Sequence, residues 1–261
     1  MNLVGTVDSV WRYPVKSMAG EALAEAFVGY AGVYGDRIYA VLDSAGARGF
    51  PYYTGRDRGQ MLLYRPRFRN PQLASKPPNQ ADALQLAALS PVYPNLTELE
   101  VDVDTPSGQT LAVDDPALLA MLADERSSSG LSLLRSHRAM TDCRPVSLIS
   151  LQTIEQLGRE VDAALDKRRF RANLYAKLGT ANGFGEDALV GRRLQIGSRV
   201  VIAVLEQDAR CKMITIDPDT GAETPAILRN VARAHGGNAG VYGAVLIEGI
   251  VRPGDPIALL G

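Results

Sequence analysis

Short runs of apolar, often β-branched residues alternate with polar positions along most of the chain, and they predict strands more often than helices. Glycine, proline, aspartate and asparagine separate these runs at close spacing, as in a β-barrel or a β-sandwich. The pattern therefore predicts a mixed α/β protein that is mainly β. The strongest runs are Leu3–Val10, Ile38–Leu42, Leu96–Val103, Leu131–Leu134, Val146–Ile149, Arg199–Leu205, Met213–Ile216 and Ala244–Ile250.

Three segments carry the signals of helices. In the longest, apolar residues recur at helical spacing on one face, and Ser150 stands just ahead of it as a capping residue. The two shorter helices each begin with a capping residue followed by proline, which suits the first helical position. We expect these helices over Leu151–Lys167, Asp115–Ala123 and Thr224–His235.

Two irregular stretches suggest how the chain divides. The segment Ser75–Asn95 is rich in proline and predicts a long loop or insertion, and Ser127–Gly130 is a second irregular stretch. At 261 residues the chain is long enough for two ordinary domains that each bury a core. We therefore expect one β-rich domain over 1–125 and a second domain over 126–261.

Composition and charge narrow the class of protein. A net charge of −1 gives the chain no overall attraction to nucleic acid or to an anionic membrane, so neither is an expected partner. Two cysteines do not make a disulfide scaffold, which favours a reducing compartment. The first residues lack the pattern of a signal peptide, and no apolar run approaches the roughly 20 residues that span a bilayer. We expect a soluble, cytoplasmic protein.

Cys211 is the first candidate for chemistry. It lies between two cations, Arg210 and Lys212, near the junction of two predicted strands. The flanking charges would favour the thiolate, which is both a nucleophile and a soft metal ligand. The alternative is a small buried residue that fills the core, since free cysteine is often buried. A Cys-His hydrolase that pairs Cys211 with His137 or His235 also stays open.

Basic residues recur at turns in several parts of the chain, and they are the second candidate. Guanidinium groups match phosphate oxygens, so convergence of these residues would form a pocket for a phosphorylated ligand. The free N–H groups at the helix start beside Ser150 would serve the same purpose. Any one of these residues alone is more often a solvated surface feature than part of a site. The basic segments are Lys16-Ser17, Asp36-Arg37, Arg168–Asn173 and Arg210.

Several short motifs occur in a fixed order along nearly the whole chain. The most specific is Arg210–Gly221, with the sequence Arg-Cys-Lys-Met-Ile-Thr-Ile-Asp-Pro-Asp-Thr-Gly. The others are Tyr13–Ser17, Gly35–Arg37, Thr54–Arg56, Asp142 with Pro145, Arg169–Asn173, Gly185–Asp187, Ile196-Gly197 and Gly254–Ile257. With these motifs the chain resembles the MOSC family, the molybdenum cofactor sulfurase C-terminal domain proteins. Within it, the chain is similar to the branch that contains the mitochondrial amidoxime reducing component.

The resemblance implies a fold, a cofactor and an activity. The fold is a MOSC β-barrel domain over 126–261, preceded by a smaller β-rich MOSC N-terminal domain over 1–125. The cofactor is molybdenum–molybdopterin (Moco), with Cys211 as the ligand of molybdenum and as the catalytic residue. The activity is an oxidoreductase reaction that reduces N-hydroxylated substrates such as amidoximes and hydroxylamino bases. The implied cofactor contacts are Lys16, Ser17, Arg37, Ser150, Arg171, Asn173 and Arg210.

The chain departs from the family pattern in three respects. Met18 stands where relatives often have cysteine, and Ala172 replaces the usual proline of an Arg-Pro-Asn motif. The four-cysteine iron–sulfur domain that some relatives carry does not follow Gly261, and two cysteines cannot ligate such a cluster. We therefore expect a separate electron-donor protein of the ferredoxin or flavin type.

Two other functions are compatible with the same cysteine. One is a non-catalytic carrier or storage protein for the molybdenum cofactor, in which Cys211 anchors the metal without turnover. The other is sulfur transfer through a persulfide of Cys211. Natural substrate and oligomeric state have no signal in the sequence.

Overall fold

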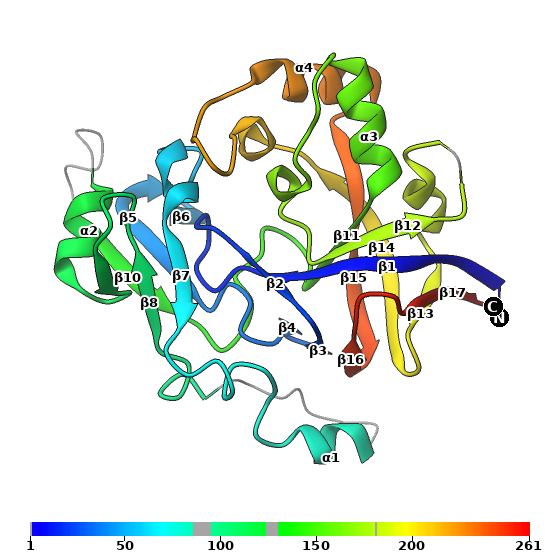
Figure 1. Cartoon of the computed structure of the whole chain (residues 1–261), viewed down its shortest axis with the longest axis horizontal. Coiled ribbons are helices and arrows are strands. Elements are labelled where there is room, and N and C mark those ends of the chain that lie inside the picture. Colours follow the sequence, from blue (N-terminus) through cyan, green and yellow to red (C-terminus); the bar gives the residue numbers. More distant parts are fainter. Residues whose placement is uncertain (1, 86–94, 124–129, 181) are drawn as a thin grey trace.

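The computed structural model describes residues 2–85, 95–123, 130–180 and 182–261. Strands dominate it, and they form two regions that lie side by side in Figure 1. One is a closed barrel, at the right of the view, and the other is a smaller β region at its left, which we call the small lobe (residues 39–68, 95–123 and 130–135). The expectation of a mainly β fold is confirmed.

Seven strands pair in a ring to form the barrel. Neighbouring strands are antiparallel except β11 and β12, which are parallel, and the pairing of β12 with β1 closes the ring. Closure leaves no edge of the ring unpaired, which protects a β-rich chain from edge-to-edge association. In order, the strands are β1 (Asn2–Arg12), β12 (Leu174–Leu178), β11 (Val146–Ser150), β15 (Asn238–Ile247), β14 (Val200–Ala209), β13 (Arg193–Ile196) and β17 (Pro256–Leu260), with β2 (Glu21–Leu23) paired to β1 outside the ring.

Apolar side chains from all parts of the ring fill the barrel. Val7 and Val10 of β1 belong to the same buried cluster as Leu194 of β13 and Ile202 of β14. Each such side chain contributes roughly 1.5–3 kcal/mol when it is fully buried. Because β1 is the first strand of the chain and β17 is the last, side chains from both ends of the sequence share one core.

The small lobe contains two three-stranded sheets around a second core. Tyr39, Met61, Leu99 and Leu118 are among its fully buried side chains. Helix α2 (Pro116–Leu122) packs into this core, and Asp115 caps it by accepting a hydrogen bond from the backbone N–H of Ala117, as its sequence predicted. One sheet consists of β10 (Leu131–Arg135), β5 (Tyr39–Ala47) and β6 (Phe50–Tyr53). The other consists of β7 (Arg65–Phe68), β8 (Val101–Asp104) and β9 (Thr110–Ala112).

One short strand connects the two cores. In β3 (Ala26–Gly29), Ala26 and Val28 belong to the barrel core, whereas Phe27 belongs to the core of the small lobe. This division follows from the alternation of side chains along a strand. β3 pairs with β4 (Gly32–Val33) and with β16 (Gly249–Val251). In β16, Val251 belongs to the barrel core and Ile250 packs against the core of the small lobe, so this small sheet contacts both cores.

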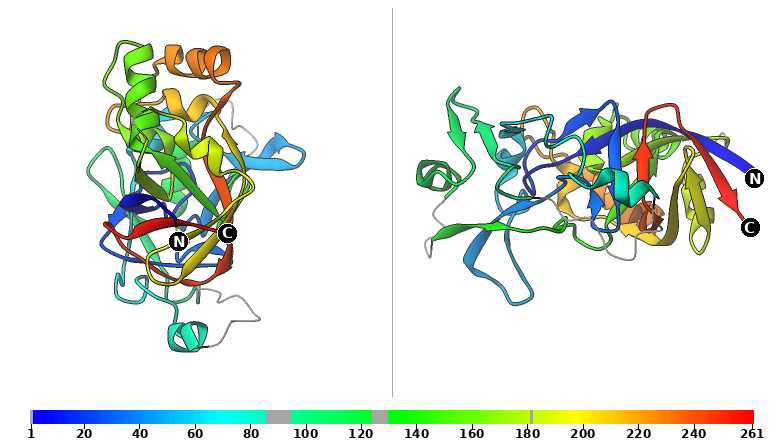
Figure 2. Two further views of the ribbon diagram at one scale, coloured as in Figure 1. Left: turned by 90° about the vertical axis from the view of Figure 1, so that its right-hand side faces the viewer. Right: turned by 90° about the horizontal axis from the view of Figure 1, so that it is seen from below.

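Two helices cover one end of the barrel. Helix α3 (Leu151–Glu160) and helix α4 (Pro225–Ala234) lie at the top of Figure 1, and the rotated view on the left of Figure 2 shows them stacked over the strands. Their buried faces share a third apolar cluster. The remaining helical segments are α1 (Gln80–Gln85) and the 3₁₀ turns η1 (Gly59–Leu63), η2 (Lys167–Phe170), η3 (Gly185–Leu189) and η4 (Lys212–Thr215).

Most strand predictions are confirmed, but one is wrong. The run Met213–Ile216 falls on η4 and its C-terminal end and not on a strand. So short an apolar run suits either structure, and packing decides between them. As a 3₁₀ turn, the segment places Ile214 in the buried cluster beneath α4, and the Thr215 hydroxyl bonds back to the Lys212 carbonyl at 2.8 Å.

Several boundaries also differ from the prediction. Strand β15 begins at Asn238, six residues before the predicted start, because Gly240 hides the strand signal. Gly240 has a φ of +84°, and a Cβ there would meet the Leu148 carbonyl oxygen at 2.9 Å. The helix predicted over Leu151–Lys167 ends at Glu160, and the strand predicted over Leu96–Val103 begins only at Val101.

The connection between the two predicted domains lies partly outside the described residues. Helix α1 occupies part of the predicted loop Ser75–Asn95, and residues 86–94 are not described. The predicted division between residues 125 and 126 also falls in an undescribed segment, 124–129, and it stays a prediction. Among the described helices, none has the length and the apolar character needed to cross a membrane.

Candidate functional site

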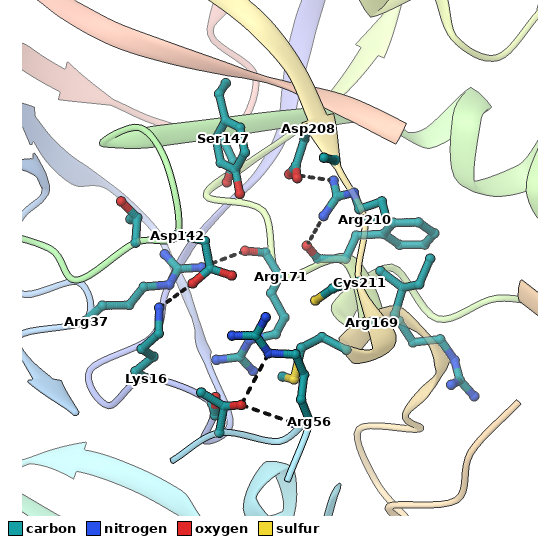
Figure 3. Close-up of a pocket in the computed structure, with 18 residues that line it drawn as sticks. Lys16, Arg37, Arg56, Asp142, Ser147, Arg169, Arg171, Asp208, Arg210 and Cys211 are labelled. Carbon is teal, nitrogen blue, oxygen red and sulfur yellow. Dashed lines mark hydrogen bonds and ion pairs between the residues drawn. The ribbon is translucent and has the colours of Figure 1, made fainter. Parts of the chain in front are cut away.

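A cavity lies where the loops of the small lobe meet the open end of the barrel strands (Figure 3). Counting its open mouth, it encloses about 700 Å³. Its walls come from the loops after β1, β4, β6 and β10, from β11, the end of β14 and the middle of β15, and from η2 and η4. The basic residues on these walls are Lys16, Arg37, Arg56, Arg169, Arg171 and Arg210.

Cys211 lies on the wall of this cavity. It directly follows the end of β14 and begins η4, with an extended backbone. The residue is half-buried, it is not in a disulfide, and its sulfur faces the cavity in Figure 3. No described residue forms a hydrogen bond with the thiol, so the sulfur can accept a ligand. The alternative of a cysteine sealed in the core does not describe this position.

The two cations that flank Cys211 are both paired with carboxylates. The Arg210 guanidinium lies 2.9 Å from Asp208 and donates to the carbonyls of Phe170 and Ala239. The Lys212 ammonium lies 2.7 Å from Glu223 at the surface. Arg210 therefore lines the cavity as a buried group with fixed partners, and the basic residues without a described carboxylate partner, Arg56 and Arg171, give the cavity its positive character.

Arg37 and Arg171 stack on the ring of Tyr13. Their guanidinium carbons lie 4.6 Å and 4.4 Å from its centre, and Arg37 donates to the Arg171 carbonyl at 2.8 Å. Arg37 is paired with Asp36, but no carboxylate among the described residues pairs with Arg171, and its Nη2 is buried without a hydrogen-bond partner. Burial lowers the pKa of Arg171 to about 10, and repulsion from Arg37 adds to the effect. An orphaned cation of this kind is suited to an anionic ligand.

The backbone is strained at three positions on the cavity wall. Ser17, Arg37 and Arg171 have φ values of 68°, 46° and 52°, in the left-handed region that glycine prefers. Each such conformation costs about 1–3 kcal/mol, and such residues cluster at functional sites. All three were expected from the sequence as site residues, and the fold brings them together from three separate loops.

Asn173 is close to the site but lies behind its wall. It is fully buried, donates to Asp36 at 3.2 Å and accepts from the backbone N–H of Ser147. Asp36 in turn holds Arg37 and the backbone N–H of Tyr13. The structure therefore gives Asn173 a supporting position, and not the direct contact with a ligand that the sequence suggested.

Ser150 is not brought to the cavity. Its hydroxyl accepts a hydrogen bond from the Thr153 N–H and caps α3, as predicted. Its own N–H donates to Glu186, which also accepts from the Thr153 hydroxyl. Two N–H groups at the helix start are thus bonded within the protein, and neither Ser150 nor the first turn of α3 lines the cavity, where the sequence suggested a contact with the ligand.

Lys16 closes one side of the cavity. Its ammonium group donates to the Met140 carbonyl at 2.8 Å and is paired with Asp142. Burial lowers the pKa of Lys16, and Asp142 partly offsets this. Burial alone would raise the pKa of Asp142, but the charge and hydrogen bond of Lys16 hold it below its usual range. The Asp142 carboxyl group is therefore ionised at neutral pH and compensates the buried Lys16 side chain.

The lining residues that had no role in the sequence prediction include Arg56, Asp142, Asp208 and Tyr242. Arg56 and Asp142 belong to motifs that the sequence displays, and those motifs are the signal that pointed to them. Asp208 and Tyr242 had no such signal: they lie on neighbouring strands, β14 and β15, and only the strand pairing brings them together.

The site does not contain a metal cluster built from protein ligands alone. Within the described ranges, no group of three or more histidine, cysteine, aspartate or glutamate side chains is arranged to hold a metal ion. A metal at Cys211 would need its other ligands from a cofactor. Neither His137 nor His235 lines the cavity, so the geometry does not support a Cys-His hydrolase.

Comparisons with known proteins gave matches over most of the chain. Residues 4–118 match the family described as the MOSC N-terminal beta barrel domain, and residues 135–258 match the MOSC domain. Mitochondrial amidoxime-reducing component 1 of Mus musculus is 24% identical over 99% of this chain and 83% of its own length. Mitochondrial amidoxime reducing component 2 of Macaca fascicularis is 25% identical over 84% of this chain and 68% of its own length. Among solved structures, the YUAD protein of Bacillus subtilis is 12% identical, with a TM-score of 0.47, over 98% of this chain and 94% of that one.

Proposed function

This chain belongs to the MOSC family, and we propose that its cavity binds a molybdenum–molybdopterin cofactor and reduces N-hydroxylated compounds. The observation that carries the proposal is the position of Cys211: an unpaired thiol faces a cavity with basic walls and one orphaned guanidinium. A soft sulfur ligand and a phosphate-binding surface are the two features that such a cofactor requires.

The residues present fit this cofactor. The Cys211 thiolate would ligate molybdenum, and the dithiolene sulfurs of the pterin would supply the further soft ligands that the protein does not offer. Arg171 has a buried nitrogen without a partner, and Arg56 is not paired with any described carboxylate, so both are free to bind phosphate. Arg37 and Lys16 line the same wall, each paired with a carboxylate, and the left-handed backbone at Ser17 helps to shape it.

The cofactor, when bound, would supply a two-electron reduction that removes oxygen from nitrogen. The chain holds the cofactor and limits access of water to it, because the small lobe covers one side of the cavity. Both curated relatives have names that describe amidoxime reduction, which supports N-hydroxylated compounds as the substrate class.

The proposal includes a separate electron-donor protein of the ferredoxin or flavin type. The sequence contains two cysteines, and an iron–sulfur cluster usually takes four thiolates. Both cysteines are free, which suits a reducing compartment such as the cytoplasm, and we propose that the protein acts there.

An activity assay on the cofactor-loaded protein tests the proposal. We expect reduction of benzamidoxime or hydroxylaminopurine when an artificial electron donor is supplied. Bound molybdenum without reduction of either compound would favour a cofactor carrier or storage protein. A protein with no molybdenum but with a cyanide-labile sulfur on Cys211 would favour sulfur transfer through a persulfide.

A further inference from the structure

Asp208 is a buried carboxyl group that the proposed cofactor binding does not use. It lies near the end of β14, and only 3% of its surface is exposed, yet it lines the same cavity as Cys211. In Figure 3 it lies on the barrel side of the site, next to the Arg210 guanidinium. The Tyr242 hydroxyl, from the neighbouring strand β15, is hydrogen-bonded to it.

The surroundings of Asp208 have opposing effects on its pKa. Burial raises the pKa of Asp208 to about 6, although Arg210 and the Tyr242 hydrogen bond both favour the carboxylate. Two further groups face it from the small-lobe side: Asp142 raises the pKa and Arg37 lowers it. An acid whose pKa lies near neutrality can both donate and regain a proton under physiological conditions.

The other carboxyl group on the wall cannot play this part. Asp142 is paired with Lys16, which holds its pKa below the usual range, so it stays ionised at neutral pH. The arginines of the wall are guanidinium groups, which do not release protons at this pH. The one lysine, Lys16, is bound by Asp142 and by the Met140 carbonyl. Among the described groups lining the cavity, Asp208 is therefore the acid best suited to proton transfer.

We propose that Asp208 donates the proton that the leaving oxygen takes up when the N–O bond of the substrate breaks. The inference rests on the proposed reductase function. The net reaction takes R–NH–OH, two electrons and two protons to R–NH₂ and water. The electrons come from the donor protein of the ferredoxin or flavin type. Asp208 supplies one proton to the oxygen, and the second proton comes from solvent.

The same contacts explain how Asp208 would be reset. After donation the carboxylate lies 2.9 Å from the Arg210 guanidinium and accepts the hydrogen bond from Tyr242, so its negative charge is compensated without movement of the backbone. Solvent entering through the open mouth of the cavity then returns the proton. Arg210 and Tyr242 act here as positioning residues.

The first experiment replaces Asp208 in the cofactor-loaded protein. We expect Asp208→Asn to keep its molybdenum but to lose kcat by about 100-fold or more, the usual contribution of a general acid. The wild-type rate should fall as the pH rises through about 6, because the acid form is then lost, and this limb should be absent in Asp208→Asn. Asp208→Glu keeps a carboxyl group, so it should restore part of the rate and also this limb, the fall of the rate with rising pH. Glu155→Gln on the exposed face of α3 makes the same chemical change away from the site and should behave as wild type.

A second variant gives a direction that a purely structural role would not produce. The Tyr242 hydrogen bond lowers the pKa of Asp208, so Tyr242→Phe should move the limb to higher pH. Infrared titration gives a readout that does not depend on turnover: the band of the protonated carboxyl should titrate with the same shift and be missing in Asp208→Asn.

The outcomes separate this inference from the proposed function. A wild-type protein that carries molybdenum but reduces no N-hydroxylated compound would overturn both. A fully active wild type, together with an Asp208→Asn variant that keeps its kcat and its pH limb, would overturn the role of Asp208 alone. Loss of molybdenum from Asp208→Asn and Asp208→Glu alike would also overturn it, since Asp208 would then hold the site together.

Discussion

Arg171 is the residue whose surroundings most clearly call for a ligand. Its guanidinium is stacked on Tyr13 beside a second cation, Arg37, and no described carboxylate neutralises it. Its backbone is also in a left-handed conformation. A folded chain keeps such a costly arrangement when binding compensates for it.

Arg171→Met should therefore stabilise the cofactor-free protein while weakening cofactor binding. We expect the free energy of unfolding to rise by about 1 kcal/mol or more, because a buried charge without a partner is replaced by an apolar side chain of similar length. The lowered pKa of about 10 keeps Arg171 protonated below that pH, so the gain should be constant through the neutral range and shrink only as the pH rises through about 10. Urea unfolding and molybdenum content measure the two effects. The exposed Arg229→Met is the control, and a destabilised Arg171→Met protein would contradict this account of its charge.

The sequence alone predicted the candidate site residues but not the directions of their side chains. Lys16, Ser17, Arg37, Arg171 and Cys211 reach one cavity from separate loops, as the family resemblance implied. Residues from the same motifs turn elsewhere: Asn173 supports Asp36, and Ser150 caps a helix. Motif order records which residues matter, whereas the direction of a side chain depends on strand pairing and backbone angles that a linear pattern does not contain.

At the scale of elements, the turn after η4, Asp217–Gly221, connects η4 to η2. Asp217 accepts hydrogen bonds from the backbone N–H groups of Asp219 and Thr220, and its other oxygen lies 2.8 Å from the Arg169 guanidinium. Asp219 pairs with Arg168. The Asp-Pro-Asp-Thr-Gly motif thereby fixes η2, from which Arg171 reaches the cavity.

The two aspartates of this turn should differ in importance. Asp217→Ala removes the turn bonds and leaves buried Arg169 without its ion pair, so it should cost about 1–3 kcal/mol and reduce molybdenum content. Asp219→Ala breaks an ion pair whose partners are both partly exposed, and it should cost less than about 1 kcal/mol. Urea unfolding compares them. Equal effects of the two substitutions would contradict the assignment of Asp217 as the residue that holds η2.

Helices and strands were predicted correctly where a local signal, such as a capping residue or a β-branched run, determines them. Asp115 and Ser150 cap helices as their sequences predicted, and the β-branched run before Cys211 is a strand. The failure at Met213–Ile216 has a tertiary cause, because packing of Ile214 beneath α4 selects a 3₁₀ turn over a strand.

At the scale of the whole molecule, the barrel depends on both ends of the chain. Strand β1 pairs with β12 on one side and β17 on the other, and Val7 and Val10 contribute to the barrel core. No local pattern in the sequence specifies this long-range pairing, and the barrel core contains side chains from both predicted domains.

A fragment of residues 126–261 should therefore not fold by itself. Without β1 the barrel would open, and both β12 and β17 would present unpaired edges that favour aggregation. Circular dichroism and thermal unfolding of the fragment test this, and addition of residues 1–125 as a separate chain should recover the folded signal. A cooperative unfolding transition of the fragment alone would contradict it.

The most direct measurement is the molybdenum content of protein isolated from cells that make the cofactor. The account predicts stoichiometric molybdenum in the wild type and in Cys143→Ala, whose thiol lies outside the cavity, and loss of molybdenum in Cys211→Ala. A wild type that takes up no molybdenum, or a Cys211→Ala variant that binds as much as the wild type, would contradict the assignment of Cys211 as the metal ligand.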